Sequence, residues 1–285
     1  MSTIKHYLSL IKFSHTVFAM PFALIGFTLA IQKVQPFHDW WLFAKVIGCM
    51  VFARTAAMAF NRYIDRRFDA LNPRTAIREI PAGIIKPGNA LVFTIVNSLL
   101  FMTVTYFINP VCFYLSPVAL LVVLGYSYTK RFTPLCHLVL GAGLALAPIG
   151  AYLAVTGVFD LLPLLFSFTV FFWTSGFDII YALQDEEFDR AHKLNSIPVL
   201  LGKKNALRAS EVLHAFSVGL IIFAGYYGHF SWIYWVGAAI YSGLIVYQHS
   251  IVKPNDLSRV NLAFGTTNGI ASVIFAVFVI TDIFL

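Results

Sequence analysis

Long apolar segments alternate with short polar connections along almost the whole chain. From Trp40 to Phe60, for example, Lys45 and Arg54 are the only charged residues. An α-helix needs about 20 mostly apolar residues to cross the hydrocarbon core of a bilayer, and the segments have roughly this length. The pattern therefore predicts nine transmembrane helices, at roughly 14–34, 40–62, 88–108, 110–128, 134–156, 160–183, 205–228, 230–250 and 260–282.

The composition agrees with a chain that is surrounded by lipid. Of the 285 residues, 59% are hydrophobic and 12% are charged, whereas soluble domains carry about 25% charged residues. The sequence shows no linker or low-complexity tract, so we expect an all-α integral membrane protein with a single domain over 1–285. The first segment lacks a small-residue cleavage pattern, and we expect it to be retained as a span. Cys49, Cys112 and Cys136 lie in or beside apolar segments without a pairing pattern, which is typical of small apolar positions.

The positive charges are concentrated in alternate connections. With nine spans, all of the 20 basic residues except Lys33, Lys45 and Arg54 fall at the amino terminus or after the second, fourth, sixth and eighth spans. The positive-inside rule then places the amino terminus in the cytoplasm and the carboxyl terminus outside, across what we expect to be a bacterial inner membrane. The net charge of +7 follows from this distribution, so we expect no nucleic-acid partner. Nothing in the sequence indicates an obligate protein partner.

Acidic residues gather in two short windows, one after the second predicted span and one at the end of the sixth. Residues four positions apart on a helix lie on one face, about 5–6 Å from each other. Asn61, Asp65 and Asp69 are therefore expected to form one stripe. The second expected stripe consists of Asp178, Tyr181, Asp185 and Asp189. Because four spans separate the two windows, both are expected on the same side of the membrane.

Like charges at this spacing repel one another, at a cost of about 3 kcal/mol per pair for an effective dielectric constant near 20. Divalent cations would offset this repulsion, since Mg²⁺ prefers carboxylate oxygens and shares its coordination shell with substrate phosphates. His and Cys are missing from both stripes, which argues against zinc or copper. The alternative is that the acidic side chains are solvated or pair with nearby arginines.

Cationic side chains near both windows suit a ligand that carries phosphate. Arginine binds phosphate oxygens through two parallel N–H groups, and lysine supplies a point charge. Arg74 and Arg78 follow the first window. Lys130 and Arg131 follow Tyr126 in YSYTKR, where a predicted span ends abruptly. Each of these cations also fits ordinary cytoplasmic charge, and the abrupt end of the span favours a functional role for Lys130 and Arg131.

Arg54 lies about two helical turns inside the second predicted span, where a lone charge costs several kcal/mol. It precedes Asn61 by seven positions, so it is expected on the same face as the first acidic stripe. A polar cavity with an anionic partner would explain the position. The alternative is that the side chain extends towards the membrane surface.

These residues resemble the UbiA superfamily of intramembrane aromatic prenyltransferases, from KFSHTVFAMPFALIG at 12–26 onward. The superfamily pattern Asn-x3-Asp-x3-Asp matches Asn61, Asp65 and Asp69 in NRYIDRRFD. Members often have Asp directly after the Asn, but this chain has Arg62, so no metal-binding role is assigned to that position. Two further patterns match, Asp-x2-Tyr-x3-Asp-x3-Asp in DIIYALQDEEFD and Tyr-x3-Lys in YSYTKR.

The resemblance implies nine transmembrane helices around a central cavity that opens laterally to lipid. It also implies Mg²⁺ that is bound by both acidic motifs and holds an isoprenyl diphosphate. The implied metal ligands are Asn61, Asp65, Asp69, Asp185 and Asp189. The implied catalytic residues are Asp65, Asp69, Asp185, Asp189, Tyr181 and Lys130. The residues expected to contact substrate are Arg54, Asn61, Arg74, Arg78, Tyr126, Lys130, Arg131 and Asp178.

Within the superfamily, ARTAAMAFN and NPRTAIREIPAG are most similar to the 4-hydroxybenzoate polyprenyltransferase branch. This similarity implies transfer of a polyprenyl group to 4-hydroxybenzoate in quinone biosynthesis. A naphthoate acceptor in menaquinone biosynthesis is an alternative. An alternative of another class is a cation-coupled transporter, although transporters usually place their sites near the bilayer midplane rather than at helix ends.

Overall fold

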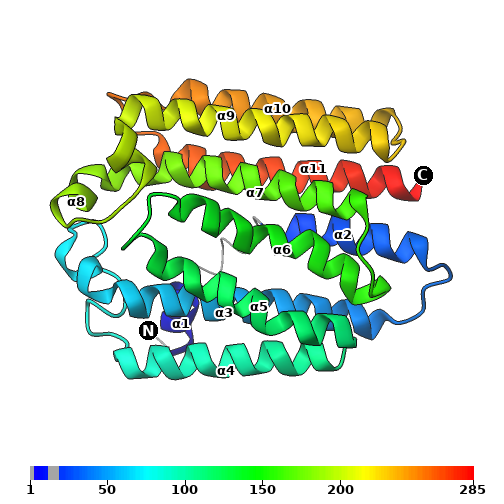
Figure 1. Cartoon of the computed structure of the whole chain (residues 1–285), viewed down its shortest axis with the longest axis horizontal. Helices are drawn as coiled ribbons and strands as arrows, with labels where there is room; N and C mark the ends of the chain where they lie inside the picture. Colours follow the sequence, from blue (N-terminus) through cyan, green and yellow to red (C-terminus); the bar gives the residue numbers. More distant parts are fainter. Residues whose placement is uncertain (1–2, 12–18) are drawn as a thin grey trace. The chain divides into compact units, whose positions relative to one another are not determined.

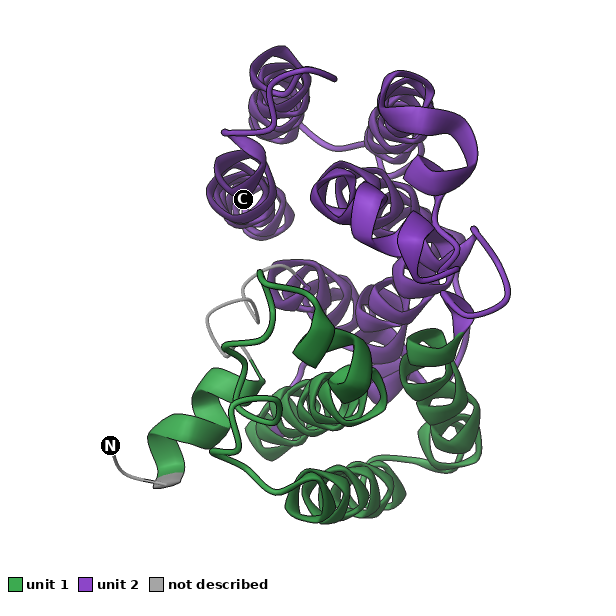
Figure 2. Cartoon of the chain, turned by 90° about the vertical axis from the view of Figure 1, so that its left-hand side faces the viewer, with its two compact units in different colours: residues 1–16, 40–128 green, residues 17–39, 129–285 purple. Residues whose placement is uncertain are grey.

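The structure is a computed structural model, and it describes residues 3–11 and 19–285. These residues form helices and connections, with one isolated β-bridge between Lys253 and Asp256. They divide into two compact units (Figure 2). The first unit contains α1, α3, α4 and α5, and the second contains α2 and α6 to α11, with the division after Tyr128 at the end of α5.

The first unit is dominated by one long helix. It contains α1 (Thr3–Leu10), α3 (Trp40–Leu71), α4 (Pro87–Tyr106) and α5 (Pro110–Thr129). α4 packs along α3 (Figure 1) and begins with a proline, whose fixed φ suits the first turn of a helix. Buried apolar side chains join α1, α3, α4 and the connection before α4, namely Leu10, Ala59, Ile80, Ile85 and Ala90.

The second unit is built around α7. It contains α2 (Met20–Lys33), α6 (Cys136–Thr156), α7 (Leu161–Ala182), η2 (Leu183–Asp185), α8 (Glu186–Ala191), α9 (Ile197–Tyr227), α10 (Trp232–Ile251), η3 (Leu262–Thr267) and α11 (Asn268–Phe284). α7 packs against α6 and α9, and α2 packs against α6 (Figure 1). The rings of Phe22, Trp173 and Phe275 are fully buried in its core, and ring centroids there lie 5.5–5.9 Å apart, as favourable aromatic pairs do.

The all-α membrane architecture is confirmed. Within the described residues, each of the nine predicted segments overlaps a helix, and seven helical segments are long and apolar enough to cross a membrane. α2, with 14 residues, is shorter. Residues 14–18 of the first predicted segment lie outside the described residues.

One predicted boundary and one predicted stripe are wrong, and both concern the acidic windows. α3 continues to Leu71, beyond the predicted end at 62, so the whole first motif lies on this helix. In the second window, α7 ends at Ala182 and the 3₁₀ turn Leu183–Asp185 precedes α8. Asp178 to Asp189 therefore do not form a stripe on one regular helix. Three acidic residues in the first turn of α8 explain the restart, because negative charge is stabilised at a helix amino terminus.

The start of α9 also differs from the predicted segment at 205–228. Ser196 caps its first turn and accepts a hydrogen bond from the Val199 N–H at 3.3 Å. Gly202 then interrupts the helix with φ 74°, a left-handed value that glycine adopts without steric cost. The predicted segment thus corresponds to the part of α9 beyond this break.

We predict that Gly26→Ala lowers the thermal stability of the protein in detergent. A Cβ at Gly26 on α2 would lie 2.1 Å from the carbonyl oxygen of Pro148 on α6, so the two helices would have to separate. Overpacking of this kind costs about 1–3 kcal/mol. The matched control is Gly150→Ala, because a Cβ at Gly150 on α6 meets no atom within 4 Å. Equal melting temperatures for the two variants would contradict the packing shown between α2 and α6.

Candidate active site

The first acidic motif occupies the last three turns of α3. The Asn61 side-chain amide donates a hydrogen bond to Asp65 Oδ2 at 2.9 Å, which confirms that these two residues share one face of the helix. Asp69 is 6% exposed. Its Oδ1 accepts a hydrogen bond from Arg78 Nη1 at 2.7 Å, while its Oδ2 is buried without a hydrogen-bond partner.

The connection after α3 folds back onto this motif and thereby positions Arg78. The Thr75 hydroxyl donates to the backbone oxygen of Asp69 at 3.1 Å, and the Arg74 N–H donates to Asn72 Oδ1 at 3.0 Å. The Arg74 side chain is exposed, whereas that of Arg78 is partly buried. The structure thus brings Arg78 into contact with Asp69, a predicted metal ligand of the same unit.

Arg54 lies on α3, partly buried, two turns before Asn61. Tyr126 on α5 interacts electrostatically with Arg54 and also with Arg62. Tyr126 and the two arginines all belong to the first unit. A polar face of α3 therefore extends from Arg54 to Asp69.

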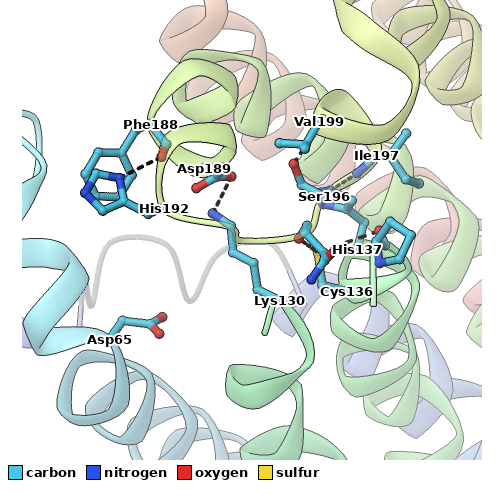
Figure 3. Close-up of polar contacts among 12 residues, drawn as sticks. Asp65, Lys130, Cys136, His137, Phe188, Asp189, His192, Ser196, Ile197 and Val199 are labelled. Atoms are coloured by element: carbon cyan, nitrogen blue, oxygen red, sulfur yellow. Dashed lines mark hydrogen bonds and ion pairs between the residues drawn. The ribbon is translucent and has the colours of Figure 1, made fainter. Parts of the chain in front are cut away.

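The second motif carries an ion pair whose acidic partner is almost completely buried. Asp189 on α8 is 1% exposed, and Lys130 Nζ lies 2.7 Å from its Oδ2 (Figure 3). This distance is that of an ion pair, yet neither carboxylate oxygen of Asp189 accepts a hydrogen bond of good geometry. The Lys130 backbone is also fixed, because its carbonyl accepts the Asn195 N–H at 2.7 Å.

The charge of Lys130 is set by its acidic neighbours. Burial favours the neutral amine, but Asp189 and, more weakly, Asp185 outweigh burial and raise the pKa of Lys130 above its usual value. The ammonium group is therefore charged at neutral pH. Arg131, the next residue, is partly buried.

Asp178 is held by a histidine that the sequence analysis did not single out. His137 Nδ1 lies 2.7 Å from Asp178 Oδ2, and the Ile197 N–H points to His137 Nε2 at 3.4 Å. A backbone N–H can only donate, so Nε2 is the acceptor and Nδ1 carries the proton that Asp178 accepts. His137 is 3% exposed. A lone histidine at the start of an apolar segment was the available signal, but its partner lies 41 residues away.

Tyr181 and Asp185 complete the second motif. The ring of Tyr181 lies against that of Phe264, with centroids 4.2 Å apart. Phe264 belongs to η3, a π-helical turn, and such turns often occur at functional sites. Asp185 is 9% exposed at the end of η2.

The donor set fits a hard cation. Each motif ends in a buried aspartate, Asp69 or Asp189, that has one neighbouring cation and at least one carboxylate oxygen without a hydrogen-bond partner. Buried carboxylate oxygens of this kind are suitable ligands for Mg²⁺. Over residues 3–11 and 19–285, no group of three His, Cys, Asp or Glu side chains lies in metal-ligating proximity.

Comparison with known proteins identifies the family. The profile of the UbiA prenyltransferase family matches residues 19–277, which is most of the chain. The chain belongs to the UbiA prenyltransferase family.

Relatives agree with this assignment. The chain is 30% identical over 243 residues to the 4-hydroxybenzoate octaprenyltransferase of Aeromonas salmonicida strain A449, covering 83% of this chain and 81% of the relative. It is 33% identical to a UbiA homolog from Aeropyrum pernix K1 solved in its apo form, with a TM-score of 0.84 and coverage of 94% and 98% of the two chains. A UbiA homolog from Archaeoglobus fulgidus, solved with DMAPP and Mg²⁺ bound, shares the fold at 22% identity, with a TM-score of 0.73 and coverage of 98% and 99%.

Membership of the UbiA family confirms the predicted resemblance, the fold class and the enzyme class. The protein is an integral membrane prenyltransferase, and the transporter alternative is set aside. The roles of individual site residues stay predictions, as does the assignment of 1–285 to a single domain.

We predict that His137→Leu destabilises the UbiA-family protein through Asp178. The substitution removes the donor to Asp178, which is 23% exposed, and the acceptor for the buried Ile197 N–H. A buried polar group left unpaired costs about 1–3 kcal/mol, and the partly exposed Asp178 adds less. His137→Gln is the matched control, since its amide can both donate and accept. Thermal unfolding in detergent measures the effect.

A double-mutant cycle with Asp178→Asn separates this pair from general packing. Directly coupled residues show a non-additive term of about 0.5–3 kcal/mol. If the effects of His137→Leu and Asp178→Asn simply add, the interaction described here is not made in the folded protein.

Proposed function

We propose that the protein transfers a polyprenyl group from an isoprenyl diphosphate to 4-hydroxybenzoate, with Mg²⁺ as the cofactor, in quinone biosynthesis. The observation that carries this proposal is the pair of buried aspartates, Asp69 and Asp189, with carboxylate oxygens that lack hydrogen-bond partners and with one cation beside each. Similar proteins agree with the proposal: one is a 4-hydroxybenzoate octaprenyltransferase, and a UbiA homolog from Archaeoglobus fulgidus was solved with DMAPP or GPP together with Mg²⁺.

The proposal requires that the two motifs face one ligand. Asn61, Asp65 and Asp69 would hold Mg²⁺ from the first unit, and Asp185 and Asp189 from the second. When bound, Mg²⁺ offsets the negative charge that develops on the departing diphosphate. Both motifs would then lie on the cytoplasmic side of one transmembrane domain, around a central cavity that opens to lipid, with the amino terminus inside and the carboxyl terminus outside.

The basic side chains have a direct part in the cleavage of the carbon–oxygen bond. As this bond breaks, its electron pair stays on the diphosphate, and the allylic carbon becomes positive. Lys130, charged because of its acidic neighbours, and Arg78, already aligned on Asp69, would stabilise the leaving diphosphate electrostatically. Arg74, Tyr126 and Arg131 would contribute further contacts to it.

The aromatic and aspartate side chains of the second motif suit the second half of the reaction. The Tyr181 ring, held against Phe264 at 4.2 Å between centroids, offers a π-face that attracts an allylic cation. The acceptor ring attacks this cation to form the new carbon–carbon bond. Loss of a ring proton then restores aromaticity. Asp178, fixed by His137, would orient the acceptor while this occurs.

Arg54 is the proposed contact for the carboxylate of the acceptor. It is a partly buried cation on the polar face of α3, beside Tyr126. A carboxylate matches the two-point geometry of a guanidinium. A hydroxynaphthoate presents the same group, so a product screen with both acceptors decides between benzoate and naphthoate chemistry.

We predict that Asp69→Asn and Asp189→Asn each reduce turnover by about 10²-fold or more, because each removes one negative oxygen from the proposed metal site. The assay incubates purified protein with Mg²⁺, a radiolabelled isoprenyl diphosphate and 4-hydroxybenzoate, followed by mass-spectrometric identification of the lipophilic product. EDTA should abolish product formation. The control is Glu187→Gln, two residues from Asp189 with a side chain that is 89% exposed, and it should retain activity. Full activity of both aspartate variants would exclude these residues from the site.

We predict that Arg54→Leu raises KM for 4-hydroxybenzoate by about tenfold or more and leaves KM for the diphosphate within about twofold, since a hydrogen bond to a charged group contributes about 1.5–3 kcal/mol. The wild type should also prefer the free acid to its methyl ester, and the variant should not. An equal change in both KM values would show that Arg54 does not recognise the acceptor.

A further inference from the structure

Arg62 is a buried cation that has no part in the proposed reaction. It follows Asn61 on α3, and 7% of its surface is exposed. Its Nε is buried without a hydrogen-bond partner, and among the described residues its side chain makes no ion pair. A guanidinium remains charged at any physiological pH, so its desolvation without a partner carries a penalty of several kcal/mol. Such a group indicates that an anion binds there.

The helix geometry directs Arg62 to the first acidic motif. Arg62 and Asp69 are seven positions apart, which is nearly two full turns, so both lie on nearly the same face of α3. Arg62 is attracted electrostatically by Asp69 and Glu79 and repelled by Arg78. All four residues belong to the first unit, and the inference therefore does not depend on the second unit.

The neighbouring carboxylates do not provide hydrogen-bond acceptors for all N–H groups of Arg62 and Arg78. Asp69 Oδ1 is already bound by Arg78. Its Oδ2 has no hydrogen-bond donor, so Arg62 does not use it either. Two guanidinium groups thus lie near one carboxylate, with N–H groups to spare. A ligand with several negative oxygens, such as a diphosphate, could pair with both arginines through parallel hydrogen bonds.

The two other arginines of this turn differ from Arg62 in surroundings. Arg66 donates to the Tyr63 backbone oxygen at 2.6 Å, and its guanidinium lies 4.4 Å from the centroid of the Tyr63 ring. Arg67 is exposed. Burial and an unpartnered nitrogen therefore distinguish Arg62 from its neighbours, and Arg67 serves as a matched control on the same helix.

We infer that Arg62 binds the diphosphate of the isoprenyl donor, together with Arg78. This inference rests on the proposed function, in which the first motif holds that diphosphate. Arg62 supplies a fixed positive charge directly beside the acidic residues. Diphosphate affinity should consequently have a component that does not depend on Mg²⁺, and this component should be lost when Arg62 is replaced by a neutral residue.

The experiment measures binding to purified protein in detergent, by competition with a radiolabelled isoprenyl thiodiphosphate. The competitors are inorganic diphosphate and the isoprenyl diphosphate, each with and without Mg²⁺. Arg62→Met should weaken the binding of both competitors by about 10- to 100-fold. It should also raise KM for the isoprenyl diphosphate by a similar factor. KM for the acceptor should stay within about twofold. Arg62→Lys should recover part of the affinity, and Arg67→Met should match the wild type.

Unchanged diphosphate affinity in Arg62→Met would overturn the inference. An equal loss of affinity for diphosphate and acceptor would also overturn it. So would an Arg62→Lys variant that binds diphosphate as weakly as Arg62→Met does, although its melting temperature is like that of the wild type. If Arg62→Met does not fold, the Arg62→Lys comparison decides, because it retains the charge but not the two-point geometry. A wild-type protein that binds no diphosphate with Mg²⁺ would instead reject the proposed function itself, before the role of Arg62 is considered.

Discussion

The structure depends on negative charge that is held out of water. Asp69 and Asp189 are each almost fully buried, each has one cation at 2.7 Å, and each keeps a carboxylate oxygen without a hydrogen-bond donor. A carboxylate in such surroundings would ordinarily take up a proton or gain further partners. The local fold limits the gain of further partners, since Thr75 fixes the backbone at Asp69 and Asn195 fixes the backbone at Lys130. The buried acids are therefore suited to an external cation and a phosphorylated ligand.

The surrounding helices supply the rigidity that this charge arrangement needs. In the second unit, α7 ends in the second motif and is anchored by a fully buried aromatic core that includes Trp173 and Phe275. The Trp173 indole N–H donates to Asn268 at 3.0 Å, next to the π-helical turn that carries Phe264. In the first unit, the motif lies on α3, which continues without interruption from the apolar segment into the polar one. Apolar packing and charge placement thus occur on the same elements.

Much of this could be predicted from the sequence, because the constraint is simple. A chain in lipid must satisfy its backbone within helices of about 20 residues, so apolar segment length predicts the spans. The acidic stripe on α3 followed from the period of the helix, and the Asn61–Asp65 hydrogen bond shows that this period holds. The extension of α3 to Leu71 was missed because a helix that leaves the membrane loses its apolar signal but not its hydrogen bonds. The break at Leu183–Asp185 was missed because charge at the start of a new helix can outweigh the continuation of the old one.

Pairs between distant positions could not be predicted. His137 and Asp178 are 41 residues apart, and Tyr181 meets Phe264 across an even longer separation. Neither partner has a local pattern that points to the other. Arg62 was visible as a departure from the motif, but its burial and its unpartnered nitrogen are properties of the folded chain.

The most direct test of the central claim is a crystal structure with Mn²⁺ in place of Mg²⁺ and a non-reactive isoprenyl thiodiphosphate. The account predicts anomalous peaks from Mn²⁺ within coordination distance of Asp69 and of Asp189, with both groups of ligands bound to the same diphosphate. Peaks at one motif alone, or motifs on opposite faces of the membrane, would contradict it.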